Sequence, residues 1–247
     1  MTPTPYSLLA AFGTTLGLWM VVRSAPERQA SRWLNGALLC LGFSLFGARL
    51  GYLLMNLAYY RQVPFEAFSL WAGGLSAAGG LVGGLLGVGL AMRAGRVRLV
   101  EALDRWSGLL PPLTASLWIG CYFSGCAYGA QVNWGLPAPD EAGNWARRVP
   151  VQFLAALTLI AYFAGLEWFQ SYRTQRPALK AIQEALSLPG MKAALSLAGL
   201  AINLFVFSDL RADPEPVFYH LRPDTWAAAG LLILAVGSMI IFLIRKA

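Results

Sequence analysis

Long apolar stretches alternate with short polar connections along the whole chain. Most of these stretches reach the roughly 20 residues that an α-helix needs to cross the hydrocarbon core of a bilayer. The pattern predicts an all-α integral membrane protein, with seven transmembrane helices bundled in a single membrane domain over residues 1–247. The seven runs cover residues 6–22, 33–59, 70–92, 106–128, 151–169, 190–207 and 225–244.

The composition agrees with a membrane protein and argues against a water-soluble one. Hydrophobic residues make up 57% of the 247 residues and charged residues only 13%, which is too apolar for a soluble domain of this size. The first run lacks a basic leader, and Arg23 stands where a small-residue cleavage site would be. We therefore expect this run to be retained as a helix and not removed as a signal peptide.

The basic residues predict the orientation of the bundle, because short cytoplasmic loops carry an excess of lysine and arginine. An outer N-terminus and a cytoplasmic C-terminus place most basic residues in inner segments. The net charge of +7 is then mainly a topology signal, with some attraction to anionic lipid. Since the basic residues are spread over several loops, no nucleic-acid partner is expected. The outer segments keep Arg61, Arg147, Arg148, Arg211 and Arg222.

Arg49 lies within the second run, about two-thirds of the way toward its outer end. An ionisable group at this depth is costly and usually faces a cavity or a partner. Arg49 is therefore a candidate functional residue, and a snorkelling side chain or a structural ion pair are the alternatives.

Small residues gather at the same level of the bundle. The third run carries glycine at every fourth position from Gly79 onward, with Gly80 one step round the helix. The segment 120–129 repeats the spacing at Gly125 and Gly129. Such faces let another backbone or a lipid chain approach a helix closely. They indicate helix crossings or, alternatively, room for a phospholipid headgroup beside Arg49.

Five segments form an ordered series. They are GARLGY at 47–52, GGLSAAGGLVGG at 73–84, Asp104 ahead of a Pro-Pro pair, IGCYFSGCAYG at 119–129 and RVPVQF at 148–153. In order and spacing, this series resembles the motifs of the bacterial prolipoprotein diacylglyceryl transferases, and the fourth segment resembles a divergent branch of that family. The resemblance covers most of the chain, from about residue 47 to residue 211.

The resemblance implies a multi-pass protein of the bacterial inner membrane with a periplasmic N-terminus. It implies transfer of diacylglyceryl from phosphatidylglycerol, or binding of another anionic phospholipid, with a prolipoprotein signal segment as acceptor and release of glycerol-1-phosphate. No cofactor is implied. The residues expected to bind the phospholipid are Arg49, Gly79, Gly80, Ser124, Gly125, Gly129, Gln152 and Arg211.

Residues that the family usually carries are missing at five positions. Ala78 stands where the family has His, Trp118 where it has Arg, Ala155 where it has an acid, and Leu204 and Ser208 where it has Arg and Glu. A thiol attacks only as the thiolate and needs a base or a cation at a poorly hydrated site. Without the usual histidine, the base is unassigned, and His220 and Tyr52 are the candidates.

Phosphate as a leaving group needs charge-assisted donors, which arginine supplies well. Arg49, Arg211 and Arg148 remain for that role. Enzyme activity is therefore uncertain, with an active transferase favoured. The alternative is a catalytically degenerate member that serves as a phospholipid-binding or assembly subunit. A transporter or channel is disfavoured, because no convincing inverted repeat is present.

The cysteines indicate no metal site. Cys121 and Cys126 are five residues apart, about 140° round an α-helix, so they form no two-ligand face. We expect both, and Cys40, to be buried, inert thiols. The outer connection at 131–148 is long enough to act as a lid or arm, and the inner stretch 178–186 predicts an amphipathic surface helix.

Overall fold

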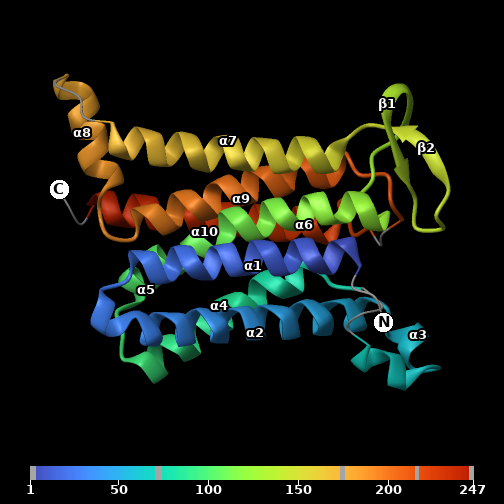
Figure 1. Ribbon diagram of the computed structural model, residues 1–247, viewed down its shortest axis with the longest axis horizontal. Coiled ribbons are helices and arrows are strands. Elements are labelled where there is room, and N and C mark those ends of the chain that lie inside the picture. The colour runs from blue at the N-terminus through green and yellow to red at the C-terminus, as the bar shows by residue number, and fades with distance from the viewer. Residues whose placement is uncertain (1–3, 70–73, 173–175, 215–216, 245–247) are drawn as a thin grey trace.

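Seven long helices run along one axis of the computed structural model, which describes residues 4–69, 74–172, 176–214 and 217–244 (Figure 1). Six of them are long and apolar enough to cross a membrane, so this is a mostly helical integral membrane protein. The seventh, α6, has 15 residues and a length of about 22 Å, less than a bilayer core of about 30 Å. The long helices are α1 (Pro5–Ser24), α2 (Ala30–Met55), α4 (Ala77–Gly95), α6 (Leu110–Ser124), α7 (Val151–Ser171), α9 (Met191–Asp209) and α10 (Pro223–Ile244).

Short elements close the two ends of the bundle (Figure 1). The expected arm at 131–148 is an antiparallel hairpin in which Pro139 pairs with Trp145, and it lies at the same end as α3. The expected amphipathic helix is α8, which lies against α7 and α9 at the opposite end, where α5 is also found (Figure 1). The short elements are η1 (Glu27–Gln29), α3 (Leu57–Tyr60), η2 (Pro64–Phe68), α5 (Leu99–Trp106), η4 (Ser107–Leu109), β1 (Gln131–Pro139), β2 (Trp145–Arg148) and α8 (Pro177–Leu186).

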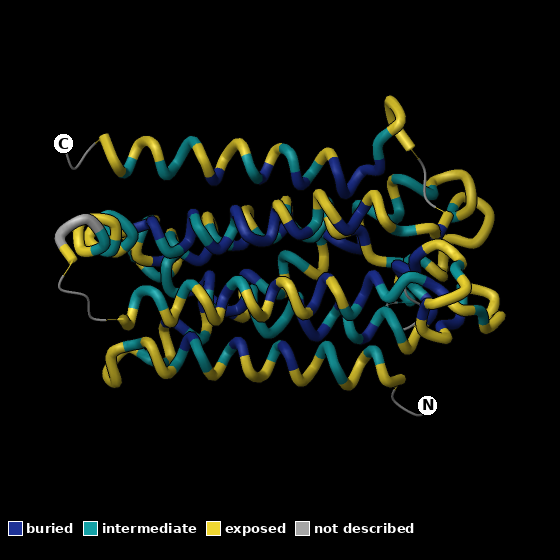
Figure 2. Tube along the Cα trace, turned by 90° about the horizontal axis from the view of Figure 1, so that it is seen from above, coloured by how far each residue is buried: buried dark blue, intermediate teal, exposed yellow. Residues whose placement is uncertain are grey.

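The burial of a residue depends on which side of its helix it occupies. Figure 2 shows buried positions on the inward sides of the helices and exposed positions on the outward sides, as expected where lipid replaces water as the solvent. One buried cluster joins α6, α7 and α9, and a second joins α1, α2, α4 and α5. In the second, the Trp106 indole donates to the Trp33 carbonyl over 3.1 Å. A third cluster joins α9 and α10 and packs against Leu81 of α4 and Leu110 of α6, so it links the other two.

The glycine face of α4 is a helix crossing. A Cβ added at any of three glycines would collide with the backbone of α2, so only bare backbone permits this contact. Ser44 of α2 also donates its hydroxyl to the Gly80 carbonyl over 2.9 Å. The facing atoms are the carbonyl oxygen of Gly47 for Gly79, the carbonyl oxygen of Phe43 for Gly83, and Cα of Cys40 for Gly87.

The boundaries of the helix expected over 106–128 are wrong. That segment is the end of α5, then η4, then α6, which ends at Ser124. Gly125 follows with φ +67°, the left-handed C-cap that glycine adopts without steric cost. The start expected at residue 70 lies outside the described residues, and within them α4 begins at Ala77, capped by Ser76.

Asp104 fixes the position of α9. Its carboxylate accepts the backbone N–H of Gly190 over 2.6 Å and that of Ala193 over 2.9 Å. An acid at this end of a helix satisfies N–H groups that have no partner within the helix and favours the helix dipole. The motif residue Asp104 therefore joins α5 to α9.

Candidate functional site

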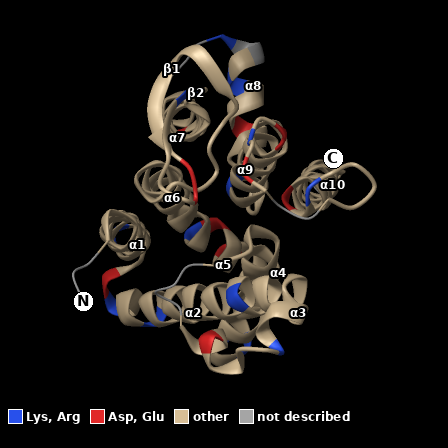
Figure 3. Ribbon diagram, turned by 90° about the vertical axis from the view of Figure 1, so that its right-hand side faces the viewer, with Lys and Arg blue, Asp and Glu red and all other residues tan. Residues whose placement is uncertain are grey.

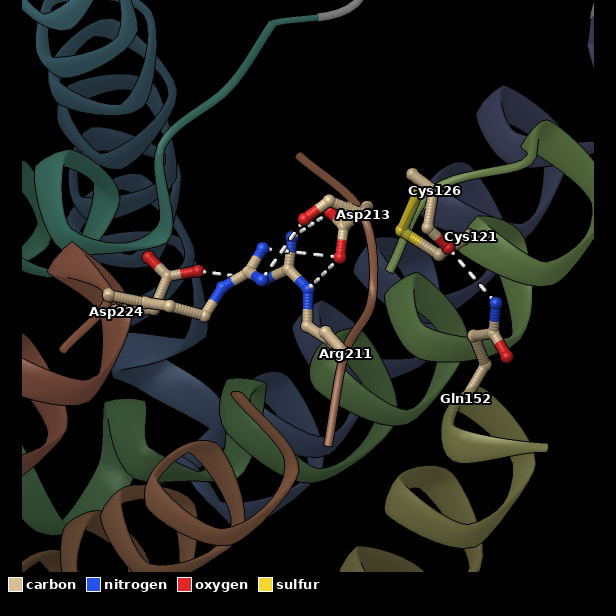
Figure 4. Close-up of a disulfide and its surroundings, with 7 residues drawn as sticks. Cys121, Cys126, Gln152, Arg211, Asp213 and Asp224 are labelled. Carbon is tan, nitrogen blue, oxygen red and sulfur yellow. Dashed lines mark hydrogen bonds and ion pairs between the residues drawn. A yellow bond between two sulfur atoms is a disulfide. The ribbon is translucent and has the colours of Figure 1, made fainter. Parts of the chain in front are cut away.

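Four charged residues form an alternating network at the hairpin end (Figure 4). Arg211 makes a two-pronged ion pair with Asp213, with N to O distances of 2.9 and 2.6 Å, and a second pair with Asp224 at 2.9 Å. Arg222 donates to the Asp213 carboxylate and carbonyl, each over 3.1 Å. Among the described residues, two arginines face two carboxylates, and charges of this kind inside a membrane protein commonly mark functional sites.

The backbone places these side chains where α9 gives way to α10. Gly129 and Arg211 form an isolated antiparallel bridge, and the Ala212 N–H donates to the Tyr128 carbonyl over 2.7 Å. Asp224 lies in the first turn of α10, where the helix dipole favours a carboxylate. Its Oδ1 is buried and has no partner among the described residues.

A disulfide joins Cys121 at the end of α6 to Cys126 (Figure 4). The expectation of inert thiols is therefore wrong for this pair, and Cys40 is the free, buried cysteine. The expected helix continued to residue 128, whereas α6 ends at Ser124. Beyond the turn, the Cα atoms of the two cysteines are only 4.7 Å apart.

Gln152 holds the same turn from α7. Its side-chain amide donates to the Cys126 carbonyl over 3.0 Å (Figure 4), and the residue is only 1% exposed. A Cβ at Gly125 would collide with the Asp140 carbonyl, and one at Gly129 would lie 2.6 Å from the Val149 carbonyl. These glycines therefore admit the hairpin against the end of α6.

Arg148, the last residue of β2, is buried. Its guanidinium stacks on the Tyr128 ring, with 4.4 Å from Cζ to the ring centroid, and its Nη2 lies 3.4 Å from the Asp140 carboxylate. Its Nε is buried and has no partner among the residues described. One donor of Arg148 can thus bind a ligand without breaking its ion pair with Asp140.

Arg49 is used differently from the phosphate contact that the sequence predicts. The side chain is 6% exposed and donates to the carbonyls of Ala67, Gly74 and Glu66 over 2.9, 3.0 and 2.6 Å. The guanidinium also lies 5.5 Å from the Tyr60 ring centroid. Arg49 thereby fastens the connection between η2 and α4 to α2.

The other expected site residues fall into separate places. Tyr52 packs beside Gly74, next to Arg49, whereas Ser124 is exposed at the end of α6. His220 is exposed with φ +64° at the tip of a two-residue turn between Phe218 and Leu221. In the described part of the chain, none of the hydrogen bonds or ion pairs given for the network involves His220.

The family's missing charged residues lie together. The Trp118 indole donates to Asn203 over 3.1 Å, and Asn203 donates to the Ala155 carbonyl and the Thr158 hydroxyl, each over 3.0 Å. Leu204 packs against the same cluster. Ser208, a residue beyond Phe207 in that cluster, is 1% exposed. Three of the five departures, Trp118, Ala155 and Leu204, therefore meet in one neutral core of α6, α7 and α9.

Sequence reasoning missed the acids of the network. Asp213 and Asp224 are not among the expected site residues, because Arg211 is the one charged residue of the family's motif that this segment keeps. The available signal was the alternation of arginine and aspartate across 209–224. Figure 3, seen from the hairpin end, shows how few charged positions lie along the helices, which makes such a cluster informative.

Electrostatics extend from the network to the hairpin tip. Burial, and then the nearby Asp213 carboxylate, raise the pKa of Glu141. Glu141 also interacts electrostatically with Arg211 and with Tyr52 of α2.

Comparison with known proteins decides the family. The family model described as prolipoprotein diacylglyceryl transferase matches residues 3–242. The chain belongs to the prolipoprotein diacylglyceryl transferase family. The resemblance seen in its motifs is thereby confirmed.

Curated relatives of this family agree over most of their length. The chain is 31% identical to the phosphatidylglycerol-prolipoprotein diacylglyceryl transferase of Nitratidesulfovibrio vulgaris (strain DSM 19637 / Miyazaki F) over 239 residues, 92% of this chain and 83% of that protein. It is 26% identical to the enzyme of the same name from Sinorhizobium medicae over 250 residues, 95% of this chain and 84% of that protein.

Proposed function

We propose that this protein transfers a diacylglyceryl group from phosphatidylglycerol to the thiol of a lipobox cysteine in a prolipoprotein. The observation that carries the proposal is the family match over residues 3–242, together with relatives whose names state this donor and acceptor. The buried arginines at the hairpin end support it, because the departing phosphate needs charge-assisted donors.

The proposed topology has seven crossings in the bacterial inner membrane, with the N-terminus and the hairpin outside. The disulfide supports an outer location for the hairpin end, since disulfides persist in oxidising compartments such as the periplasm. The excess of basic residues in the opposite segments supports a cytoplasmic location for α5, α8 and the C-terminus. In this topology α6 crosses with the help of η4, which precedes it directly.

The proposed reaction is a substitution at carbon. The cysteine sulfur attacks the carbon of the diacylglyceryl group that is bonded to a phosphate oxygen. The C–S bond forms, and the C–O bond between this carbon and the phosphate breaks. The electron pair leaves with glycerol-1-phosphate, and the thiol proton passes to a base. That base remains unassigned, with His220 and Tyr52 as candidates.

Arg211 and Arg148 are the proposed phosphate-binding residues. Arg148 offers a buried Nε with no partner in the described chain, whereas Arg211 would exchange part of its contact with Asp213 or Asp224. The contacts of Arg49 support a different task, which is to hold the segment before α4 in place.

The remaining expected residues shape the site. Gly79 and Gly80 admit α2 against α4, and Gly125, Gly129 and Gln152 hold the hairpin against α6. In this proposal they position the walls around the lipid, and Ser124 contributes an exposed hydroxyl at the end of α6.

Transfer to a synthetic lipobox peptide tests the proposal. The purified protein is incubated with the peptide and phosphatidylglycerol, and the peptide mass is followed. We expect a gain of one diacylglyceryl group, reduced by about 10²–10³ in rate in Arg211→Ala, as for loss of a preorganised electrostatic group. Arg61→Gln is the matched control, because Arg61 is an exposed arginine at the same end.

A second function is favoured by one observation, the neutral core around Trp118 and Asn203. It is a phospholipid-binding or assembly subunit that has lost transfer. Unchanged peptide mass with intact phosphatidylglycerol binding supports this second function. Unchanged mass without lipid binding contradicts both.

A further inference from the structure

A cavity of about 1270 Å³ opens at the end of the bundle opposite the hairpin. Its walls come from the last turn of α1, from α5, from the start of α9, and from the inner ends of α7 and α10. In Figure 1 these elements lie at the α5 and α8 end. The cavity is therefore separate from the arginine network described above.

The acids that line the cavity already have partners. Glu101 pairs with Arg105 at 3.7 Å and Glu167 with Lys192 at 3.8 Å. Both oxygens of Asp104 accept backbone N–H groups of α9. Glu101 and Glu167 thus neutralise one cation each, and Asp104 caps α9. The residues that line the cavity keep a net positive charge.

Two cations of the lining make no ion pair with any described residue. Arg98 is exposed just before α5, and Arg23 is exposed in the last turn of α1. The Arg23 guanidinium lies 5.1 Å from the centroid of the Trp19 ring, which holds it at the mouth of the cavity. An anion entering there meets two arginines from different elements.

The other part of the wall is apolar. It includes Trp19, Met20, Leu188 and Phe242, and Trp19 is 52% exposed on a membrane-spanning helix. Tryptophan concentrates at the boundary between headgroups and hydrocarbon. The cavity thus presents a charged rim and an apolar wall at the level of the membrane interface.

The volume of the cavity favours a ligand larger than a phospholipid headgroup alone. Typical small-molecule sites measure about 300–1,000 Å³, so a cavity of about 1270 Å³ exceeds the space needed for a glycerol phosphate. A phospholipid with an anionic phosphate fills both parts of the wall, whereas a soluble phosphate uses only the rim.

We propose that this cavity binds an anionic phospholipid from the leaflet that surrounds the α5 and α8 end, with its phosphate between Arg23 and Arg98. The site is independent of the proposed transfer reaction. Only its assignment to the cytoplasmic leaflet depends on the orientation proposed above.

Photo-crosslinking locates the lipid directly. The full-length protein in neutral-lipid vesicles is exposed to trace diazirine-labelled phosphatidylglycerol, and the adducts are mapped by peptide mass spectrometry. We expect adducts on peptides containing residues 19–24, 98–108 and 187–192. Because one basic residue near an anionic lipid contributes about five-fold in binding, Arg23→Gln combined with Arg98→Gln should lower these adducts about 20- to 30-fold.

Matched controls separate the site from a general basic surface. Arg28→Gln combined with Arg93→Gln removes the same charge from exposed residues at the same end but outside the lining, and should leave the adducts unchanged. Equal losses in both double variants overturn the proposal. Phosphatidylcholine with the same acyl chains also overturns the proposal if it competes as well as unlabelled phosphatidylglycerol, because the adducts would then come from annular lipid. Equally strong competition by glycerol 3-phosphate overturns it too and would identify a site for soluble phosphate.

The assay also separates this proposal from the transferase proposal. Adducts that map only to the hairpin end overturn the proposed cavity site and remain consistent with the proposed transferase site. Loss of peptide transfer in Arg211→Ala with inner adducts intact supports both sites as independent.

Discussion

Removal of the Cys121–Cys126 disulfide should weaken the fold by a calculable amount. The bond closes a loop between residues five apart in sequence. In the chain-entropy model, closing so short a loop restricts the unfolded chain by about 2 kcal/mol. For a protein of this size, 1 kcal/mol shifts the midpoint of thermal unfolding by about 2–4 °C. Cys121→Ser combined with Cys126→Ser should therefore lower the midpoint by about 4–8 °C.

Thermal unfolding in detergent, followed by intrinsic fluorescence with and without reductant, measures this effect. Oxidised wild type should unfold at the higher temperature, and reduced wild type should coincide with the double variant, which does not respond to reductant. Cys40→Ser is the control, because Cys40 is a free, buried cysteine. It should keep the full difference between oxidised and reduced protein.

Counting thiols decides whether the premise holds. Alkylation in denaturant should label one cysteine before reduction and three after it. Three labelled cysteines in unreduced protein isolated from membranes would refute the pairing and remove the main structural support for an outer hairpin. An intact bond without any change of midpoint on reduction would show that the turn is held by Gln152 and the hairpin contacts instead.

Three further perturbations test other parts of the structure. Asn203→Leu leaves the Trp118 indole N–H buried and unpaired, so we expect a loss of about 1–3 kcal/mol in the free energy of unfolding, measured by denaturant titration. Gly79→Leu overpacks the α2 and α4 crossing and should cost about 1–3 kcal/mol, whereas Gly89→Leu, with open space around the glycine, should unfold like wild type. Backbone N–H donation, first from Asn144, lowers the pKa of Asp140. The ionised Asp140 therefore stabilises the hairpin above the unfolded pKa of about 4, and this stabilisation is lost as pH falls through the folded pKa. Hydrogen exchange of the hairpin should rise in that pH range, and Asp140→Ala should remove the pH dependence.

Much of the fold follows from the apolar pattern. Helices expected over 6–22, 151–169 and 225–244 differ from α1, α7 and α10 by only a few residues at each end, because apolar length is the dominant signal in a membrane. The amphipathic helix expected over 178–186 is also present as α8. Length and periodicity predict these elements because each helix depends mainly on residues that are close together in the sequence.

The end of α6 could not be predicted in the same way. Between 119 and 129 the sequence remains apolar and small, so hydropathy continues through Gly125 although the backbone turns there. The turn depends on contacts that are distant in sequence, namely the Asp140 carbonyl against Gly125 and the Gln152 amide on the Cys126 carbonyl. The disulfide follows from that turn and was missed with it.

The role of Arg49 shows why composition identifies a costly charge but not its partner. The depth of Arg49 in the second run correctly indicated that its charge must be compensated. The compensation comes from backbone carbonyls of 66–74 and the Tyr60 ring. Carbonyl acceptors leave no trace in a sequence, so the sequence predicts a lipid phosphate, a structural ion pair or a snorkelling side chain for Arg49 instead.

The departures from the family become understandable because three of the five share one core. A buried arginine at position 118 without an acid at 155 or 208 would be an unpaired buried charge, which is strongly destabilising. Replacing all these charges together leaves Trp118, Ala155 and Leu204 packed around an amide that satisfies the indole. Any transfer chemistry must therefore draw its charged groups from elsewhere, and the buried arginines at the hairpin end are the set that this chain retains.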